Sequence, residues 1–83
     1  MRAQIKNALL LCLQAADGEP MPEVALIAAA QIKCRPARPT ISDVEVALQE
    51  LEAEKFAAAV TDDFSKERSW TLTTKGTHKA RQL

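Results

Sequence analysis

The chain has 83 residues, enough for one small domain over residues 1–83 that buries roughly 60% of the surface exposed by its unfolded form. Hydrophobic residues make up 47% and charged residues 27%, with 2 Gly and 4 Pro, which is typical of a folded globular domain and excludes a disordered chain. The 11 basic and 11 acidic side chains cancel, which argues against a protein that holds phosphate backbones by net charge alone.

The cellular compartment follows from what the sequence lacks. No apolar run reaches the roughly 18 to 20 residues that a membrane span needs, and no small-residue cleavage site follows the Leu-rich run near the amino terminus. The two cysteines stand in different settings, Cys12 in an apolar run and Cys34 beside a turn, so they do not suggest a disulfide framework. We expect a cytoplasmic protein without a membrane anchor.

Charge is segregated along the chain. Residues 1–40 carry five basic and three acidic side chains, residues 41–63 carry one basic and seven acidic side chains, and residues 64–83 carry five basic and one acidic. The distribution therefore says more about binding partners than the total does.

A first helix is predicted over Arg2 to Ala16. Its apolar residues at spacings of three and four share one face, and Asp17-Gly18 ends it, since Gly supplies the left-handed cap without a Cβ penalty. These apolar residues are Ile5, Ala8, Leu9, Cys12, Leu13 and Ala16. Leu10 and Leu11 lie outside the face; either they are covered within the domain, which we favour, or they form a dimer contact.

An extended link and a second helix follow. The alternating prolines of Glu19–Pro22 bias the backbone toward extended conformations and allow pairing only at a sheet edge. Pro22 suits the first turn of a helix that runs to about Lys33, with Glu23 at its positive end. This helix is apolar nearly all round, and residues 28–30 are alanines, so neighbouring helices can approach it closely.

A stiff basic turn leads into the best-marked helix of the chain. The turn, residues 34–39 (CRPARP), has two prolines and two arginines without a neighbouring acid, and it is longer than the turn of a compact helix–turn–helix. The helix, residues 40–55, begins at Thr40 as N-cap, with Asp43 placed for a capping box. The residues predicted to form its buried stripe are Ile41, Val44, Ala47, Leu48 and Leu51.

After this helix the apolar period changes toward two. We predict strands over residues 56–60 and 69–73, joined by a polar loop over residues 62–68 into a hairpin. The predicted core-facing residues are Phe56, Ala58 and Val60 on the first strand and Trp70 and Leu72 on the second. Thr73 is placed to cap a last short helix, which Gly76 weakens.

This order of elements, together with the segments VEVALQELEAEKF and SWTLTTKG, resembles bacterial winged-helix regulators of the PadR-like and MarR-like groups. The resemblance implies an α+β fold, with a three-helix core and a C-terminal two- or three-stranded β-hairpin wing. The sequence departs from these regulators in two respects. It lacks the glycine that usually ends the third helix, where Lys55 and Phe56 stand, and it lacks an effector domain.

In such regulators the third helix enters the major groove and the wing contacts phosphates. The resemblance therefore implies a small module that binds double-stranded DNA, as a transcriptional regulator or accessory factor. Ser42 and Gln49 are the good readers of base edges on the outer face of the third helix, whereas Glu45 and Glu50 at its margins oppose a polyanion. The residues expected to contact DNA are Arg35, Arg38, Thr40, Ser42, Gln49, Lys66 and Arg68, with Lys33 and Lys75 as further candidates.

A module that binds protein and not DNA is the alternative. In this reading the acidic third helix, through Glu45, Glu50, Glu52 and Glu54, meets a basic partner, and Leu10, Leu11 or Phe64 supplies an apolar anchor. Phe64 lies in the middle of the polar hairpin loop, where it either folds back on the hairpin, which we favour, or is exposed for a partner. A homodimer stays open.

We expect no enzyme. The only histidine, His78, lies in the tail, and Cys12 is expected to be buried, so neither a catalytic Cys–His pair nor a metal site can be assembled. Cys34 is expected to be the more exposed thiol, which is compatible with redox sensing but more often incidental. No glycine loop for phosphates and no cofactor site is visible, and no small-molecule substrate is indicated.

Overall fold

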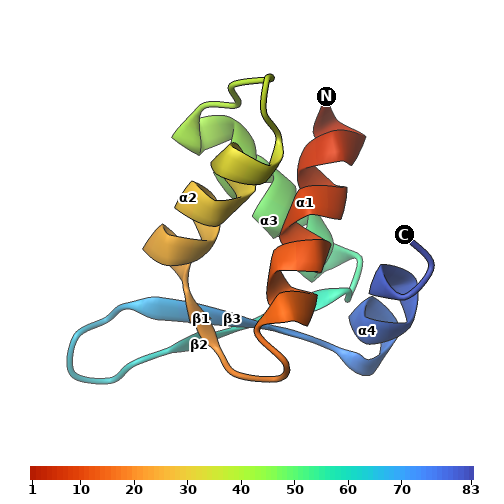
Figure 1. The fold of residues 1–83 in the computed structure, drawn as a ribbon. Coiled ribbons are helices and arrows are strands. Elements are labelled where there is room, and N and C mark those ends of the chain that lie inside the picture. Colours follow the sequence, from red (N-terminus) through yellow and green to blue (C-terminus); the bar gives the residue numbers. More distant parts are fainter.

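The computed structural model describes residues 1–83 and has an α+β fold (Figure 1). Its elements, in chain order, are α1 (Arg2–Ala15), β1 (Met21–Pro22), α2 (Glu23–Lys33), α3 (Ile41–Ala53), β2 (Ala57–Thr61), β3 (Arg68–Leu72) and α4 (Thr74–Ala80). Helices α1, α2 and α3 stand together on the sheet, the β2–β3 hairpin extends outward below α2, and α4 lies at the other end of β3. This is the arrangement of a winged helix, as predicted.

The sheet is antiparallel with the order β1-β3-β2. β1 is a two-residue strand in which Met21 pairs with Trp70, so the proline-rich link does lie at a sheet edge as expected. In the hairpin Ala57 is paired with Leu72 and Ala59 with Trp70. The wing is therefore three-stranded, the larger of the two predicted sizes.

One apolar core joins the three helices to the sheet. Trp70 is its largest member, and its indole Nε1–H donates to Glu23 Oε1 at 2.9 Å, which ties the centre of β3 to the start of α2. Leu10 is buried, and Leu11 is half-buried, so these side chains are covered largely within the domain. The larger buried side chains are Ile5, Leu9, Leu10, Leu13, Leu26, Ile27, Val44, Leu48, Leu51 and Trp70.

The residues that follow α3 show that the first strand begins one residue later than predicted. Lys55 has a positive φ of 67°, Lys55 N donates to Glu52 O at 3.0 Å, and Phe56 N donates to Leu51 O at 2.9 Å. This is the bonding of a helix end that usually uses glycine, and here a lysine takes the left-handed position. Because Phe56 still belongs to the helix end, the strand begins at Ala57, one residue later than predicted.

The strand faces are consequently reversed relative to the prediction. Ala57 is buried and Ala59 is half-buried, whereas Ala58 is exposed and Val60 is 60% exposed, so the expectation that Ala58 and Val60 face the core is wrong. A shift by one residue moves every side chain of a strand to the other face. On β3 the prediction is correct: Trp70 is buried and Leu72 packs against the core.

Ile41 is a second correction. It is 58% exposed, whereas Val44, Ala47, Leu48 and Leu51 are buried as predicted. Ile41 is the first residue after the N-cap, where the helix has just begun and no neighbouring element covers it.

None of the helices is long and apolar enough to traverse a lipid bilayer.

Candidate nucleic-acid interface

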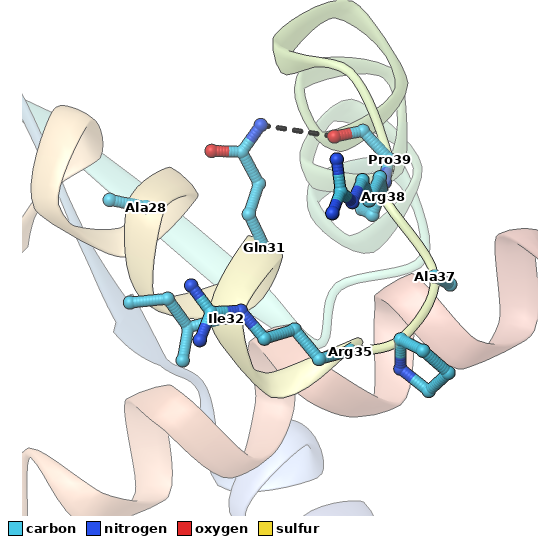
Figure 2. Close-up of a pocket in the computed structure, with 8 residues that line it drawn as sticks. Ala28, Gln31, Ile32, Arg35, Ala37, Arg38 and Pro39 are labelled. Atoms are coloured by element: carbon cyan, nitrogen blue, oxygen red, sulfur yellow. Dashed lines mark hydrogen bonds between the residues drawn. The ribbon is translucent and has the colours of Figure 1, made fainter.

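The turn between α2 and α3 presents two of the predicted arginines. Gln31 Nε2 donates to the Pro39 carbonyl oxygen at 3.0 Å and holds the turn against α2 (Figure 2). Arg35 and Arg38 are exposed, and neither has a carboxylate within 4.0 Å. Both arginines border a hollow of about 820 Å³. Ala28 and Ile32 of α2 and the remaining residues of the turn also line this hollow. The turn is therefore a basic rim with two unpaired guanidinium groups.

The start of α3 is fixed by a complete capping box. Asp43 N donates to Thr40 Oγ1, and Thr40 N donates to Asp43 Oδ2, each at 3.0 Å. The hydrogen bond from the backbone N–H of Thr40 is the main cause that lowers the pKa of the Asp43 carboxyl, and the bond with the Thr40 hydroxyl is the second cause. Because a hydroxyl group that accepts one bond can still donate another, Thr40 keeps a donor for a phosphate.

Ser42 and Gln49 occupy the outer side of α3. Both are exposed, and neither side chain makes a hydrogen bond within the domain. They are seven residues apart, close to two helical turns or about 10.5 Å. Val46 and Ala53 lie between and beyond them on the same exposed side. This face offers two side chains that can read base edges, and the exposed Glu45, three residues from Ser42 and four from Gln49, lies at its margin.

The acids at the margins of this face differ in their surroundings. Glu50 forms ion pairs with Arg2 and with Lys6, and Lys6 Nζ also lies 2.6 Å from Glu54 Oε1. The hydrogen bond with Glu54 is the main cause that raises the pKa of Lys6. Glu45 has no cation within 4.0 Å. Of the two acids expected to oppose DNA, α1 neutralises Glu50 and leaves Glu45 uncompensated.

The wing loop is ordered by one carboxylate. Asp62 Oδ1 accepts hydrogen bonds from Phe64 N at 2.7 Å and from Ser65 N at 3.2 Å. Both bonds lower the pKa of the Asp62 carboxyl, and the bond from Phe64 has the larger effect. Phe64 itself is 98% exposed, so the expectation that it folds back on the hairpin is wrong. The reason is that the loop turns on Asp62 and leaves no apolar surface beside the ring.

The remaining predicted residues follow this loop. Lys66 and Arg68 are exposed and unpaired, and the Arg68 guanidinium lies 5.4 Å from the centroid of the Trp70 ring. A second hollow, bordered by Lys66 and Arg68, extends over Val24 and Ala28 on α2. Ala28 belongs to both hollows. Arg35 and Arg38 therefore border one hollow and Lys66 and Arg68 the other, and the two hollows adjoin on the outer side of α2.

The thiols are arranged differently from the expectation. Cys34 is fully buried, 0% exposed, in the core, whereas Cys12 is only half-buried, and both thiols are free. The turn folds the side chain of Cys34 inward although the flanking Lys33 and Arg35 are exposed. Burial, as the largest effect, raises the pKa of the Cys12 thiol. Cys34 is therefore not a surface redox sensor.

Comparison with solved structures finds a protein of similar fold. BpsR of Bordetella bronchiseptica shares the fold with a TM-score of 0.68 and 20% sequence identity, over 93% of this chain and 53% of the BpsR chain. The BpsR structure addresses how 6-hydroxynicotinic acid regulates DNA binding by that protein. This chain thus spans about half the length of BpsR, and the similarity establishes a common fold.

No protein-family model matches the sequence, and no curated protein matches it. The specific resemblance to PadR-like and MarR-like regulators therefore stays a prediction.

Two sets of exposed residues are not identified by the sequence pattern. The first is the basic side of α4, where Lys79 and the C-cap Arg81 are exposed. Lys75, already a further candidate for DNA contact, lies beside them with its Nζ 4.5 Å from the Phe56 ring centroid. The excess of basic residues near the carboxyl terminus is the signal for this set. The second is the apolar outer side of α2, where Val24 is 83% and Ile32 58% exposed. The nearly uniform hydrophobicity of α2 is its signal, but core packing alone accounts for that pattern equally well.

Proposed function

We propose that this domain binds double-stranded DNA, with the outer face of α3 toward the bases and the cations of the turn and the wing on the phosphates. One observation carries the proposal: Arg35, Arg38, Lys66 and Arg68, all exposed and without a carboxylate partner, border two hollows that share Ala28. The ion pairs of the chain instead use Arg2 and Lys6 of α1. Unpaired cations are free to replace the counterions of a duplex, and this release drives most of the binding.

Two side chains on the outer face of α3 support this orientation. Ser42 and Gln49 have unused hydrogen-bonding groups at a separation of about 10.5 Å, which matches about three base pairs along the groove. Thr40 adds a donor beside the phosphates at the start of the helix. The fold shared with BpsR, whose DNA binding is the subject of its structure, is a further support. A regulator or accessory role in transcription would follow from such binding.

Salt dependence is the decisive experiment. Anisotropy of a fluorescein-labelled duplex of mixed sequence is measured between about 50 and 200 mM salt. Neutralisation of four phosphates predicts a log–log slope of affinity against salt of about −3.6. Replacing Arg38 or Arg68 with Glu is expected to weaken binding at least tenfold and to make the slope shallower by about one, because one phosphate fewer is neutralised. If no duplex is bound at low salt, the proposal fails.

Two further variants test the orientation, and a third serves as the matched control. Glu45→Gln removes the uncompensated charge beside the bases and is expected to tighten binding, whereas Gln49→Ala is expected to weaken it. Lys79→Glu makes the same charge change as the arginine variants, but on α4, away from the proposed interface. It is expected to leave affinity within about twofold. An equal loss of affinity from Lys79→Glu would mean that binding follows net charge rather than this surface.

A domain that binds protein is the second candidate, because Phe64 is 98% exposed in an ordered loop. An aromatic side chain in that setting is a typical anchor of a protein interface. The exposed acids Glu45 and Glu52 then favour a basic partner. Phe64→Ser is expected to abolish capture of such a partner and to leave thermal stability unchanged. This candidate gains support only if the duplex experiment is negative.

A further inference from the structure

Helix α2 is apolar on two sides, and only one of them is covered. Leu26, Ile27 and Ala30 face the core. On the outer side Val24 and Ile32 are 83% and 58% exposed. Ala28, exposed between them, completes a stripe at spacings of four residues. A helix that is apolar all round is normally buried all round, so the outer stripe lacks its partner.

The stripe is the floor of a groove with basic ends. The hollow beside the α2–α3 turn and the hollow beside the wing meet at Ala28, and together we name them the α2 groove. Arg35 and Arg38 border one end of the groove, and Lys66 and Arg68 border the other. Two acids, Glu23 and Glu67, also border it, so the four cations leave an excess of two positive charges. The groove therefore has an apolar floor and a net positive rim.

We propose that the α2 groove binds an acidic amphipathic helix of a partner protein. The stripe from Val24 to Ile32 covers eight residue steps, about 12 Å, which suits apolar anchors at i, i+4 and i+8 on a helix laid along it. Carboxylates near both ends of that helix meet the two pairs of cations. None of the four cations has a carboxylate partner beforehand, so the charge complementarity directs a negative ligand to this groove.

Two other occupants fit less well. A duplex would place phosphates against Val24 and Ile32, whose apolar surface offers a phosphate no hydrogen bond. A second copy of this chain would have to insert its own acidic helix, α3. The exposed apolar residues of α3, Ile41 and Val46, lie about 140° apart around the helix, so they do not form a stripe that matches the groove.

Binding in the α2 groove has a consequence for DNA. The helix covers Arg35, Arg38, Lys66 and Arg68, the cations assigned to the phosphates above. The two ligands therefore compete. This competition rests on the proposed DNA binding, whereas occupancy of the groove by the acidic helix does not.

The probe is a synthetic helical peptide with Leu at positions i, i+4 and i+8 and Glu clustered near both ends. Its fluorescently labelled form is titrated with the intact chain and compared with a peptide of the same composition whose leucines are scrambled off the stripe. A third peptide carries Lys in place of Glu. We expect binding of the first peptide at least tenfold tighter than of either control. Equal binding of the first and scrambled peptides overturns the proposal.

The variants separate the groove from the DNA interface. Val24→Ser with Ile32→Ser is expected to weaken peptide binding at least tenfold, because the leucines of the peptide then meet hydroxyl groups in place of aliphatic surface, and to leave duplex binding within about twofold. Val60→Ser, at a valine on β2 whose 60% exposure is close to the 58% of Ile32, is the matched control and is expected to change neither. Gln49→Ala is expected to weaken the duplex alone. Peptide binding that survives the double variant overturns the proposal.

Self-association is the remaining outcome. The mass of the wild-type chain in solution is measured by light scattering across a range of concentrations. A dimer that Val24→Ser with Ile32→Ser converts to a monomer would mean that a second copy occupies the groove, which overturns the proposal. If the duplex is not bound but the peptide is, the proposed DNA binding fails and the α2 groove stands.

Discussion

The hydroxyl of Thr73 donates to the carbonyl oxygen of Lys55 at 2.6 Å, and so joins the start of α4 to the end of α3. The same hydroxyl oxygen accepts from Gly76 N at 3.0 Å, and Thr73 N donates to Phe56 O at 3.1 Å. Lys55, the left-handed residue just past the C-cap of α3, has a carbonyl oxygen that no backbone N–H reaches. One side chain thus satisfies groups from two helices.

Thr73→Val is expected to destabilise the domain by about 1–2 kcal/mol. Valine keeps the shape of the side chain but removes a helix cap and the bond to Lys55. Urea denaturation followed by the fluorescence of Trp70 measures the effect. Thr73→Ser, which keeps the hydroxyl, is expected to lose less than half as much stability. Equal losses would mean that the methyl group of Thr73, rather than its hydrogen bonds, matters.

Gly76→Ala is expected to destabilise the domain by about 2 kcal/mol or more, although alanine normally favours a helix over glycine by about 1 kcal/mol. A Cβ at Gly76 would lie 1.8 Å from the carbonyl oxygen of Phe56, a backbone atom that cannot move without displacing the end of α3. Thr74→Ala, at an exposed position of α4, is the control and is expected to be nearly neutral. A stabilised Gly76→Ala variant would contradict this packing.

The capping box predicts a dependence of stability on acid pH. Hydrogen bonds from Thr40 lower the pKa of Asp43 in the folded state, so the carboxylate stabilises folding above its unfolded pKa of about 3.9. This contribution is lost as pH falls through the lower, folded pKa. The stability advantage of the wild type over Asp43→Ala is therefore expected to shrink as the pH falls below about 4. A difference that is constant over this range would contradict the assignment.

The thiols are expected to react in the order opposite to that indicated by their neighbours in the sequence. Iodoacetamide should modify Cys12 before Cys34 in the folded chain, because Cys34 is wholly buried and Cys12 half-buried. Burial raises the pKa of Cys12, so its reaction should be slow at neutral pH and faster in alkali. Peptide mass spectrometry gives the order. Denatured protein, in which both thiols are accessible, is the control, and faster modification of Cys34 in the folded chain would contradict the structure.

Local features of the sequence determined most of the elements. Thr40 and Asp43 indicate the start of α3. A capping box needs only two residues three positions apart, so it can be recognised in the sequence. The spacing of Val44, Leu48 and Leu51 identifies the buried side of the same helix, since the helical period does not depend on distant residues. The winged-helix order of elements follows from such local signals.

The tertiary structure decided which side chains face outward. Lys55 takes the left-handed position at the end of α3, which delays β2 by one residue and turns Val60 to solvent. Cys34 is buried and Phe64 exposed because the surrounding backbone turns one inward and gives the other no surface. The α2 groove likewise has at its two ends cations that lie about 30 positions apart in the sequence. Periodicity cannot reveal such relationships, because they depend on register and on contacts between elements distant in the chain.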